Sequence, residues 1–181
     1  MVERWCQETY TFHFPIGKAT ITLEDVAVLL GLPVDGAPVI AADTLRTIEE
    51  RQALCQELLG ATPPSHCFSF GRLRISWLVG QIGAMPAGEL PADVLVRYAR
   101  ITILCIIGGH YLADNSDSMV KLMYLPLLRD LDDCGRLSWG SAVLAWLYRC
   151  LCRGTLQGTR AILGALMLLQ VRLTIYDRII N

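Results

Sequence analysis

Residues 22–36 read Thr22-Leu-Glu-Asp-Val-Ala-Val-Leu-Leu-Gly-Leu-Pro-Val-Asp-Gly36, and this stretch carries the signals for both ends of a helix. Thr22 is a suitable N-cap, because its side-chain oxygen can accept a hydrogen bond from an unpaired amide of the first turn. Glu24 and Asp25 follow in that turn, where the helix dipole favours negative charge. Gly31 is placed to end the helix as a C-terminal cap. The stretch therefore predicts a short helix whose apolar stripe is made of Leu23, Val26, Ala27 and Leu30.

The segment before this helix has the pattern of a β-hairpin. Residues Thr9–Thr22 alternate aromatic or β-branched side chains around Pro15 and Gly17, which favour a turn. We expect one strand to carry its aromatic side chains on one face and a second strand to return through Ala19–Ile21. The aromatic residues are Tyr10, Phe12 and Phe14.

The chain after Gly36 is dominated by helical patterns that glycine or proline residues separate. Pro91 suits the first turn of a long helix over Ala92–Gly108, which is apolar nearly all round in its second half and should be central. Ser138 is expected to cap a helix over Trp139–Arg153. Its residues expected to face inward are Val143, Trp146, Leu147, Cys150 and Leu151. Further helices are expected from Asp43 or Thr44 to Leu59 and over Phe68–Gln81, Val120–Asp130 and Thr159–Ile175. A polar loop is expected over Ala113–Ser118. The sequence thus predicts a mainly α fold in a single domain over residues 1–181, with a short N-terminal β-hairpin followed by an irregular multi-helix array.

The composition describes a chain with ample apolar surface and little net charge. It is 53% hydrophobic and 18% charged, which excludes global disorder. The formal net charge of −1 removes the usual electrostatic basis for general binding to nucleic acids or acidic membranes. The apolar runs Ile101–Ile107 and Ala161–Val171 are shorter than the roughly 20 residues that a membrane-spanning helix needs. We therefore expect no membrane association.

The seven cysteines have no regular spacing. Several stand inside apolar helical patterns, where a reduced thiol behaves as a small hydrophobic side chain. The opening Met1-Val-Glu-Arg-Trp5 also lacks the basic-then-apolar order of a secretory signal. An intracellular, reducing compartment is expected.

Residues that could carry chemistry lack the spacing that the chemistry needs. Cys150-Arg-Cys152 could supply two zinc ligands, but no second compact pair stands at a matching distance along the chain. Ser141 lacks the Gly-x-Ser-x-Gly elbow of a nucleophilic serine. No motif supplies a nucleophile or a Schiff-base context for the remaining candidates, which are His13, His66, His110, Lys18 and Lys121. We therefore predict no catalytic, cofactor-binding or metal-binding residues and no enzymatic activity.

The segment Thr22–Ile40 has a second interpretation. It resembles the opening of a DNA-binding helix-turn-helix, with small Ala27 followed four residues later by turn-forming Gly31. A recognition helix should then begin with basic or amide side chains, whereas Pro33 and Asp35 stand there. A DNA-binding module remains an alternative to the interaction domain considered below.

A longer similarity runs through the chain in a fixed order of motifs. These are Glu3-Arg-Trp5, Glu8-Thr-Tyr-Thr-Phe-His-Phe-Pro15, Ile21-Thr-Leu-Glu-Asp-Val-Ala-Val-Leu-Leu-Gly-Leu-Pro-Val-Asp-Gly36, Gly108-Gly109, Tyr124-Leu-Pro-Leu-Leu-Arg-Asp130 and, most specifically, Gly135-Arg-Leu-Ser-Trp-Gly-Ser-Ala-Val-Leu-Ala-Trp-Leu-Tyr-Arg149. Over residues 3–178 they resemble the plant mobile domain. This domain occurs in MAIN-like proteins and in related transposon-borne sequences, and is sometimes called "aminotransferase-like".

The resemblance implies a nuclear protein that acts in meristem maintenance, genome stability and the silencing of transposable elements. It also implies a nuclear protein partner, in some members a phosphatase-like one, and no catalytic residues. The family usually continues beyond the position of Gln170 with a tryptophan-containing helix, and it usually has small or apolar residues where Gly109-His-Tyr-Leu112 stands. We therefore expect the N-terminal part of a longer family domain, in a truncated or transposon-derived copy. An uncovered apolar face of such a copy would favour self-association.

Four hypotheses of function follow. The leading one is a non-enzymatic nuclear interaction domain, and the alternatives are a DNA-binding module using Thr22–Ile40 and a transposon-derived protein without host function. A cryptic enzyme, the fourth, would need a pocket in which polar groups converge.

Overall fold

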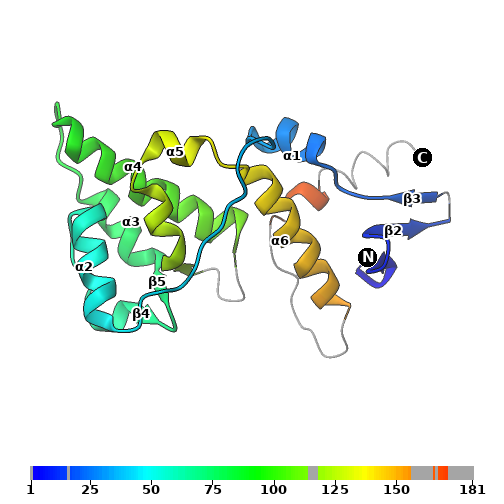
Figure 1. Ribbon diagram of the computed structural model, residues 1–181, viewed down its shortest axis with the longest axis horizontal. Helices are drawn as coiled ribbons and strands as arrows, with labels where there is room; N and C mark the ends of the chain where they lie inside the picture. Colours follow the sequence, from blue (N-terminus) through cyan, green and yellow to red (C-terminus); the bar gives the residue numbers. More distant parts are fainter. Residues whose placement is uncertain (1, 16, 114–117, 156–164, 166, 171–181) are drawn as a thin grey trace. The chain divides into compact units, whose positions relative to one another are not determined.

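The computed structural model of the chain describes residues 2–15, 17–113, 118–155, 165 and 167–170. Helices predominate, and an antiparallel hairpin precedes them, so the predicted fold class is confirmed (Figure 1). Contacts divide the chain into two compact units. Unit 1 comprises residues 1–39 and 136–181, and unit 2 comprises residues 40–135. The prediction of a single domain over residues 1–181 stays a prediction.

Unit 1 begins with a three-stranded sheet, after a 3-10 turn η1 over Val2–Arg4. The predicted hairpin is β2 (Thr11–Phe14) with β3 (Gly17–Ala19), and β1 (Trp5–Cys6) adds a strand that the pattern did not predict. In the register, Trp5 pairs with Phe12 and Phe12 pairs with Ala19. All three side chains are buried, so this row forms the apolar face of the sheet.

Helix α1 covers Leu23–Leu30, as its capping residues predict. The Thr22 hydroxyl accepts a hydrogen bond from the Asp25 amide at 3.2 Å, and the Asp25 carboxylate accepts one from the Thr22 amide at 2.8 Å. This reciprocal capping box satisfies two amides that the helix leaves unpaired. Gly31 ends the helix in the left-handed conformation, with φ of 64°.

Helix α6 covers Trp139–Gly154 and packs against α1 and β1. The residues predicted to face inward are buried apart from Trp146, which is half-buried. The buried ones are Val143, Leu147, Cys150 and Leu151. Ser138 stands at the N-cap position as predicted, but its side chain makes no capping hydrogen bond.

Unit 2 begins with helix α2 over Ile48–Leu59, which starts later than predicted. Its N-cap is Thr47, whose hydroxyl accepts a hydrogen bond from the Glu50 amide at 3.2 Å, while the Glu50 carboxylate accepts one from the Thr47 amide at 3.1 Å. The predicted cap at Asp43 or Thr44 is therefore wrong. Thr47 is the N-cap because, of the three positions, it alone has a glutamate three residues later to complete a capping box.

A second three-stranded antiparallel sheet lies in unit 2, in the order β4 (Phe68–Ser69), β5 (Arg72–Arg74) and β6 (Met119–Lys121). A short 3-10 turn, η2 (Ser65–Cys67), precedes it. The sheet contradicts the first half of the helix predicted over Phe68–Gln81. Phe70 and Gly71 both have positive φ, 45° and 76°, so the backbone reverses in a two-residue turn through which no helix can run. Only the second half is helical, as α3 (Ile75–Gly83).

The helix predicted over Val120–Asp130 is also partly wrong. It opens as strand β6, where Val120 pairs with Leu73 and both side chains are buried. The chain then winds into a 3-10 helix, η4 (Leu122–Leu128), which contains Pro126. Proline lacks the amide that an α-helical turn needs there. Helix α5 (Leu131–Gly135), which the pattern did not predict, follows.

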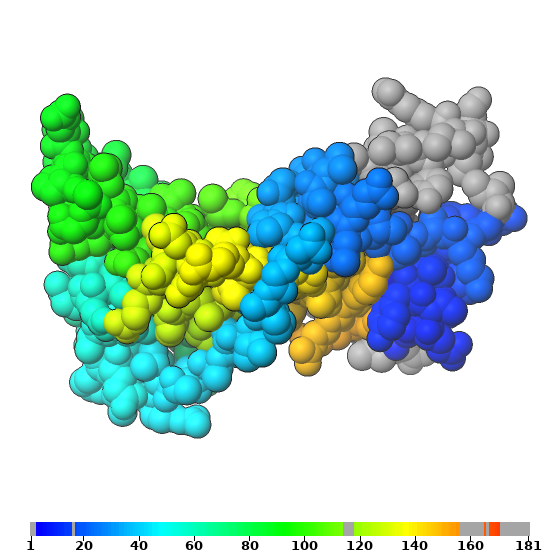
Figure 2. All heavy atoms as spheres, turned by 45° about the horizontal axis from the view of Figure 1, so that its top comes forward, coloured from blue at the N-terminus to red at the C-terminus, as the bar shows by residue number. Residues whose placement is uncertain are grey.

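The long central helix is confirmed as α4 (Ala92–Ile106), which Pro91 precedes and which packs against α2, α3 and η4. Its continuation is a π-turn, η3 (Ile107–Tyr111), in which the Leu112 amide donates to the Ile107 carbonyl at 2.8 Å. The connection from α3 to α4, residues 84–91, is largely exposed and shows in green at the surface (Figure 2).

Two predicted segments lie largely outside the described residues. Only Ala113 and Ser118 of the polar loop expected over Ala113–Ser118 are described, and of the helix expected over Thr159–Ile175 only residues 165 and 167–170 are, with 167–170 helical. In the part of the chain that the structure describes, every helix is too short or too polar to span a membrane.

Candidate functional site

The most specific family-like motifs meet in unit 1, where residues 33–37 lie along the start of α6. The Gly140 amide donates to the Pro33 carbonyl and the Ser138 amide donates to the Ala37 carbonyl, both at 2.8 Å. Ala37 and Leu137 also form an isolated parallel bridge. We call this contact between residues 33–37 and 136–141 the motif junction.

Two serine hydroxyls also form hydrogen bonds across the motif junction. Ser138 Oγ donates to the Val34 carbonyl at 2.7 Å, and Ser141 Oγ donates to the same carbonyl at 3.1 Å. The hydroxyl of Ser138, which could have capped α6, and that of Ser141, which could have acted as a nucleophile, are therefore both hydrogen-bonded to the backbone. The amide of Gly140 in the first turn of α6 is also taken, although such amides can bind anions where they are free.

Two glycines allow this close approach. A Cβ on Gly36, whose φ is 110°, would lie 2.2 Å from the Arg136 carbonyl oxygen. A Cβ on Gly140 would lie 2.8 Å from Val34 Cγ1. Non-bonded heavy atoms rest at about 3.5–4.0 Å, so any side chain at either position would force the segments apart.

The backbone of residues 32–40 in and beside the motif junction bears on the helix-turn-helix alternative. Residues 32–40, all of which are described, contain no helix after the Gly31 cap. Their carbonyls at Pro33, Val34 and Ala37 are bound to the start of α6 instead. The second, recognition helix that would enter the major groove is therefore absent from Thr22–Ile40.

An aromatic cluster joins the sheet of unit 1 to α6. The Trp5 ring meets Phe12 edge-on with centroids 4.8 Å apart, and Tyr10 stacks on Tyr148 at 5.4 Å and 7°. The Tyr148 hydroxyl donates to the Ile21 carbonyl, which leads into α1. Trp5 and Phe12 are buried and Tyr10 is half exposed, and the rings meet in the geometries that aromatic pairs prefer, so the cluster holds the sheet, α1 and α6 together.

The cysteines that suggested a zinc ligand pair also lie in packed surroundings. Cys150 is buried in α6, and the sulfur of Cys152 lies 3.3 Å from the Trp5 indole nitrogen, which donates to it. Among the described residues, no group of three or more histidine, cysteine, aspartate or glutamate side chains could hold a metal ion. In unit 2, burial raises the pKa of the Cys55 thiol to about 12, which keeps it protonated and unreactive.

The candidate bases are dispersed over the surface. His13 is exposed on β2, with its Nε2 3.4 Å from the Thr9 hydroxyl, and His66 and His110 are exposed in unit 2. Of the two lysines, Lys18 pairs with His13 in the hairpin and Lys121 ends β6. Within unit 1 the hairpin brings His13 and Lys18 side by side, and within unit 2 the other three residues stand on separate elements, His66 on η2, His110 on η3 and Lys121 on β6.

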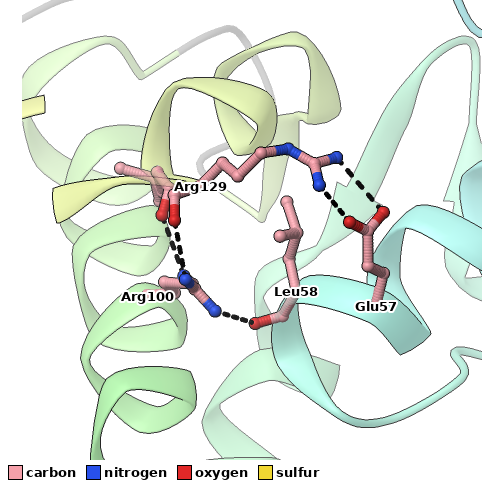
Figure 3. Close-up of polar contacts among 5 residues, drawn as sticks. Glu57, Leu58, Arg100 and Arg129 are labelled. Atoms are coloured by element: carbon pink, nitrogen blue, oxygen red, sulfur yellow. Dashed lines mark hydrogen bonds and ion pairs between the residues drawn. The ribbon is translucent and has the colours of Figure 1, made fainter. Parts of the chain in front are cut away.

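Unit 2 contains a polar cluster that sequence reasoning missed (Figure 3). The Arg100 guanidinium on α4 donates to the carbonyls of Leu58 at 3.1 Å, Leu128 at 2.8 Å and Arg129 at 2.8 Å. It thereby satisfies carbonyls at the end of α2 and at the end of η4, which regular helical bonding leaves unpaired. No local pattern announces such a contact, since its partners stand 28 to 42 residues away in the sequence.

An ion pair completes this cluster. The Arg129 guanidinium binds the Glu57 carboxylate through two nitrogens, as the two dashed lines between them show (Figure 3). The hydrogen bond from Arg129 lowers the pKa of Glu57, and the same bond raises the pKa of Arg129. Both charges are engaged with each other, so the cluster ties α2, α4 and η4 together and offers no unpaired acid or base.

Comparisons with known proteins agree with this picture of a family scaffold. The chain is 40% identical over 170 residues to "Protein MAIN-LIKE 2", 41% over 172 residues to "Serine/threonine-protein phosphatase 7 long form homolog" and 36% over 170 residues to "Protein MAINTENANCE OF MERISTEMS", all from Arabidopsis thaliana. Each match covers 94% of this chain but only 25%, 12% and 35% of the respective relative, so the chain spans about a third or less of their length. No solved structure matches. The model of the plant mobile domain matches residues 1–179, and the chain therefore belongs to the plant mobile domain family.

Proposed function

We propose that this plant mobile domain is a non-enzymatic protein-interaction domain of the plant nucleus. The motif junction is the observation that carries the proposal. Residues of the most distinctive family-like motifs form hydrogen bonds within the domain. The hydroxyls of Ser138 and Ser141 donate to the Val34 carbonyl, and the Gly140 amide donates to the Pro33 carbonyl. A fold whose motif residues are occupied in this way presents surfaces rather than reactive groups.

The biological setting is proposed from the relatives. One of them is named for the maintenance of meristems, and we propose that this chain acts in the same setting, in meristem maintenance, genome stability and the silencing of transposable elements. Another relative is named as a phosphatase homolog. A phosphatase-like nuclear protein is accordingly the partner that we propose.

The test is capture of the partner from plant nuclei by the tagged full chain, with identification by mass spectrometry. Two glycine variants of one motif make a matched pair. Gly140→Leu places a side chain where even a Cβ would lie 3.0 Å from the Pro33 carbonyl oxygen, while Gly135→Ala has nothing within 4 Å. We expect a phosphatase-like protein to be enriched with the wild type and with Gly135→Ala, and its loss with Gly140→Leu would show that capture needs the folded domain.

Three results would contradict the proposal. One is a chain that stays outside the nucleus or enriches no nuclear protein above the tag alone. The second is turnover of a phosphate ester by the purified chain. The third is a salt-sensitive complex with random duplex DNA in a gel shift, which would favour direct DNA binding instead. A transposon-derived protein without host function would give no partner and no complex.

A further inference from the structure

The turn between β4 and β5 in unit 2 carries a side chain that its backbone disfavours (Figure 1). Ser69 pairs with Arg72, so the hairpin reverses through only two residues, Phe70 and Gly71. Both have positive φ, 45° and 76°, as the type I′ turn of such a hairpin requires. Asparagine, aspartate or glycine is favoured at the first position, whereas a bulky side chain at positive φ is a conformational outlier. Phe70 therefore stands where the fold by itself favours another residue.

The Phe70 ring adds little to the packing of unit 2. Its residue is 93% exposed, the largest exposed fraction among the large hydrophobic residues that the structure describes. Phe68, two residues earlier, pairs instead with the buried Leu73 and shares its face of the sheet. A backbone held at a disfavoured φ occurs in folded proteins mainly at functional sites. We therefore look for the reason for this ring in a contact outside the chain.

The outward face of the same sheet carries positive charge. Side chains alternate along a strand, so Arg72 and Arg74 lie on the face opposite the buried Leu73. The register places Lys121 of β6 directly beside Arg72. Two positive side chains in that relation disfavour a sheet on their own. We call Phe70, Arg72, Arg74 and Lys121 the Phe70 patch.

One carboxylate lies beside the Phe70 patch. Asp43 covers Gly71, where an added Cβ would be 2.4 Å from Asp43 Oδ2. The three basic side chains and this carboxylate together carry a net charge of +2. Residues 40–135, which form unit 2, contain eight lysine or arginine residues and eleven aspartate or glutamate residues. The patch is thus a positive site on a unit whose sequence is acidic.

We propose that the Phe70 patch is the docking site for the protein partner, which receives the Phe70 ring in an apolar pocket with an acidic rim. Aromatic and arginine side chains are the residues that most often dominate the energy of protein interfaces. The basic side chains around the ring select a negatively charged surface by complementarity. This inference rests on the proposed function and deepens it, because it names where the partner binds and with what kind of surface.

A single-stranded nucleic acid is the competing class of ligand. Proteins bind it by stacking successive bases on successive aromatic rings and by contacting phosphates with basic side chains. Apart from the basic residues, the outward face of the three strands adds only Ser69 and Met119 to the single ring of Phe70. The acidic sequence of unit 2 also opposes the approach of a polyanion. These observations favour the protein partner.

The experiment is site-specific photo-crosslinking of the tagged full chain in an extract of plant nuclei. The photoreactive residue p-benzoylphenylalanine replaces Phe70 in one sample and Val28 in the control, since Val28 is a 76% exposed apolar residue on α1 in unit 1. Mass spectrometry of the crosslinked peptide identifies the contacted surface, so the readout is more specific than capture. We expect position 70, and not position 28, to crosslink to an apolar segment that aspartate or glutamate side chains surround.

Substitution of the ring separates docking from folding. Phe70→Asn should raise the midpoint of thermal unfolding by about 2–4 °C, because asparagine suits the turn, and yet lower the affinity for the partner by about tenfold or more. A residue with a merely structural role would not combine a gain in stability with a loss of binding. Phe70→Gly is a second variant with the same expected loss of binding, because glycine suits positive φ without any side chain.

Reversal of charge tests the acidic rim. Arg74→Glu should weaken binding by about tenfold, and a carboxylate at this position, the N-cap of α3, is compatible with the dipole of that helix. Lys18→Glu is the matched control, because Lys18 is an exposed basic residue in the sheet of unit 1, and it should leave binding unchanged. Circular dichroism of each variant shows that the fold is kept.

The outcomes distinguish this inference from the proposed function. A partner that binds equally well to the wild type, Phe70→Asn and Arg74→Glu overturns the inference and leaves the proposed function standing. A crosslink from position 70 to a basic surface, to RNA or DNA, or to a second copy of the chain also overturns it, as does a crosslink from position 28 in its place. If the wild type enriches no nuclear protein, the proposed function is wrong and this inference falls with it.

Discussion

Two adjacent glycines in the π-turn η3 should respond in opposite ways to the same small change. A Cβ on Gly108 would lie 2.3 Å from Val120 Cβ, 2.7 Å from Val120 Cγ2 and 3.0 Å from Val120 Cα. A Cβ on Gly109 would have Ile75 Cδ1 as its nearest neighbour, at 3.8 Å. Gly108→Ala therefore overpacks the contact between η3 and β6, while Gly109→Ala fills ordinary space.

The magnitude follows from the overlap. Non-bonded carbons rest at about 3.5–4.0 Å, so the Gly108→Ala methyl would intrude by more than about 1 Å. Val120 cannot turn away, because it is 1% exposed and its strand is paired with β5. Overpacking of a core costs about 1–3 kcal/mol, and we expect about 3 kcal/mol here since the backbone of β6 must move. Gly109→Ala should be neutral or stabilise by up to about 1 kcal/mol, because alanine restricts the unfolded chain.

The measurement is the free energy of unfolding from urea titrations of the full chain, with hydrogen exchange on peptides of β6 to place the effect in unit 2. Gly108→Ala should shift the midpoint down and speed exchange in β6, and Gly109→Ala should do neither. Equal effects of the two substitutions, or no cost for Gly108→Ala, would refute the steric reasoning.

Four further changes have expected outcomes. Phe70→Asn should raise stability by about 1 kcal/mol in thermal unfolding, because Phe70 is 93% exposed and asparagine suits a turn position with positive φ; no gain would contradict the turn assignment. Arg100→Met should lower the free energy of unfolding by about 3 kcal/mol, since three carbonyls lose a charged donor, and Arg100→Lys should recover only part of it. Glu57→Gln should cost stability at neutral pH but not in acid, because the hydrogen bond from Arg129 lowers the Glu57 pKa in the folded state and the stabilisation is lost as pH falls through that lowered pKa; a difference that persists in acid would argue against the ion pair. In the folded chain at about pH 8, iodoacetamide should modify Cys6 far faster than Cys55. Hydrogen bonds from Thr9 lower the pKa of Cys6, whereas burial raises the pKa of Cys55, and peptide mass spectrometry measures both rates.

Features coded over a few residues could be predicted from the sequence. The α1 caps at Thr22 and Gly31 are correct because each depends only on residues within one turn. The start of α2 belongs to the same class, since the capping box of Thr47 and Glu50 lies within one turn and can be read from the sequence. The absence of a helix over Phe68–Arg74 depends on β6, which pairs with β5 from more than forty residues away, and no local pattern carries that pairing.

The polar contacts of α4 were harder to predict for a related reason. The apolar run in α4 predicted a central helix correctly, but periodicity alone could not say that Arg100 would turn inward to carbonyls of α2 and η4. Its partners come from other elements, so the direction of the Arg100 side chain emerges only when the helix is placed beside them. The polar cluster around Arg100 is therefore a property of packing rather than of sequence pattern.

Substitutions at closely packed glycines test the fold, whereas substitutions at exposed side chains test the function. At Gly36, Gly108 and Gly140 an added Cβ would lie 2.2, 2.3 and 2.8 Å from its neighbours, so these positions are fixed by sterics whatever the chain binds. A loss of activity in such a variant says only that the scaffold has failed. Val28 on α1 has no such constraint, because 76% of its surface is exposed. A phenotype of Val28→Glu in a folded chain would therefore report on what the surface of unit 1 binds, which a variant of the motif junction cannot do.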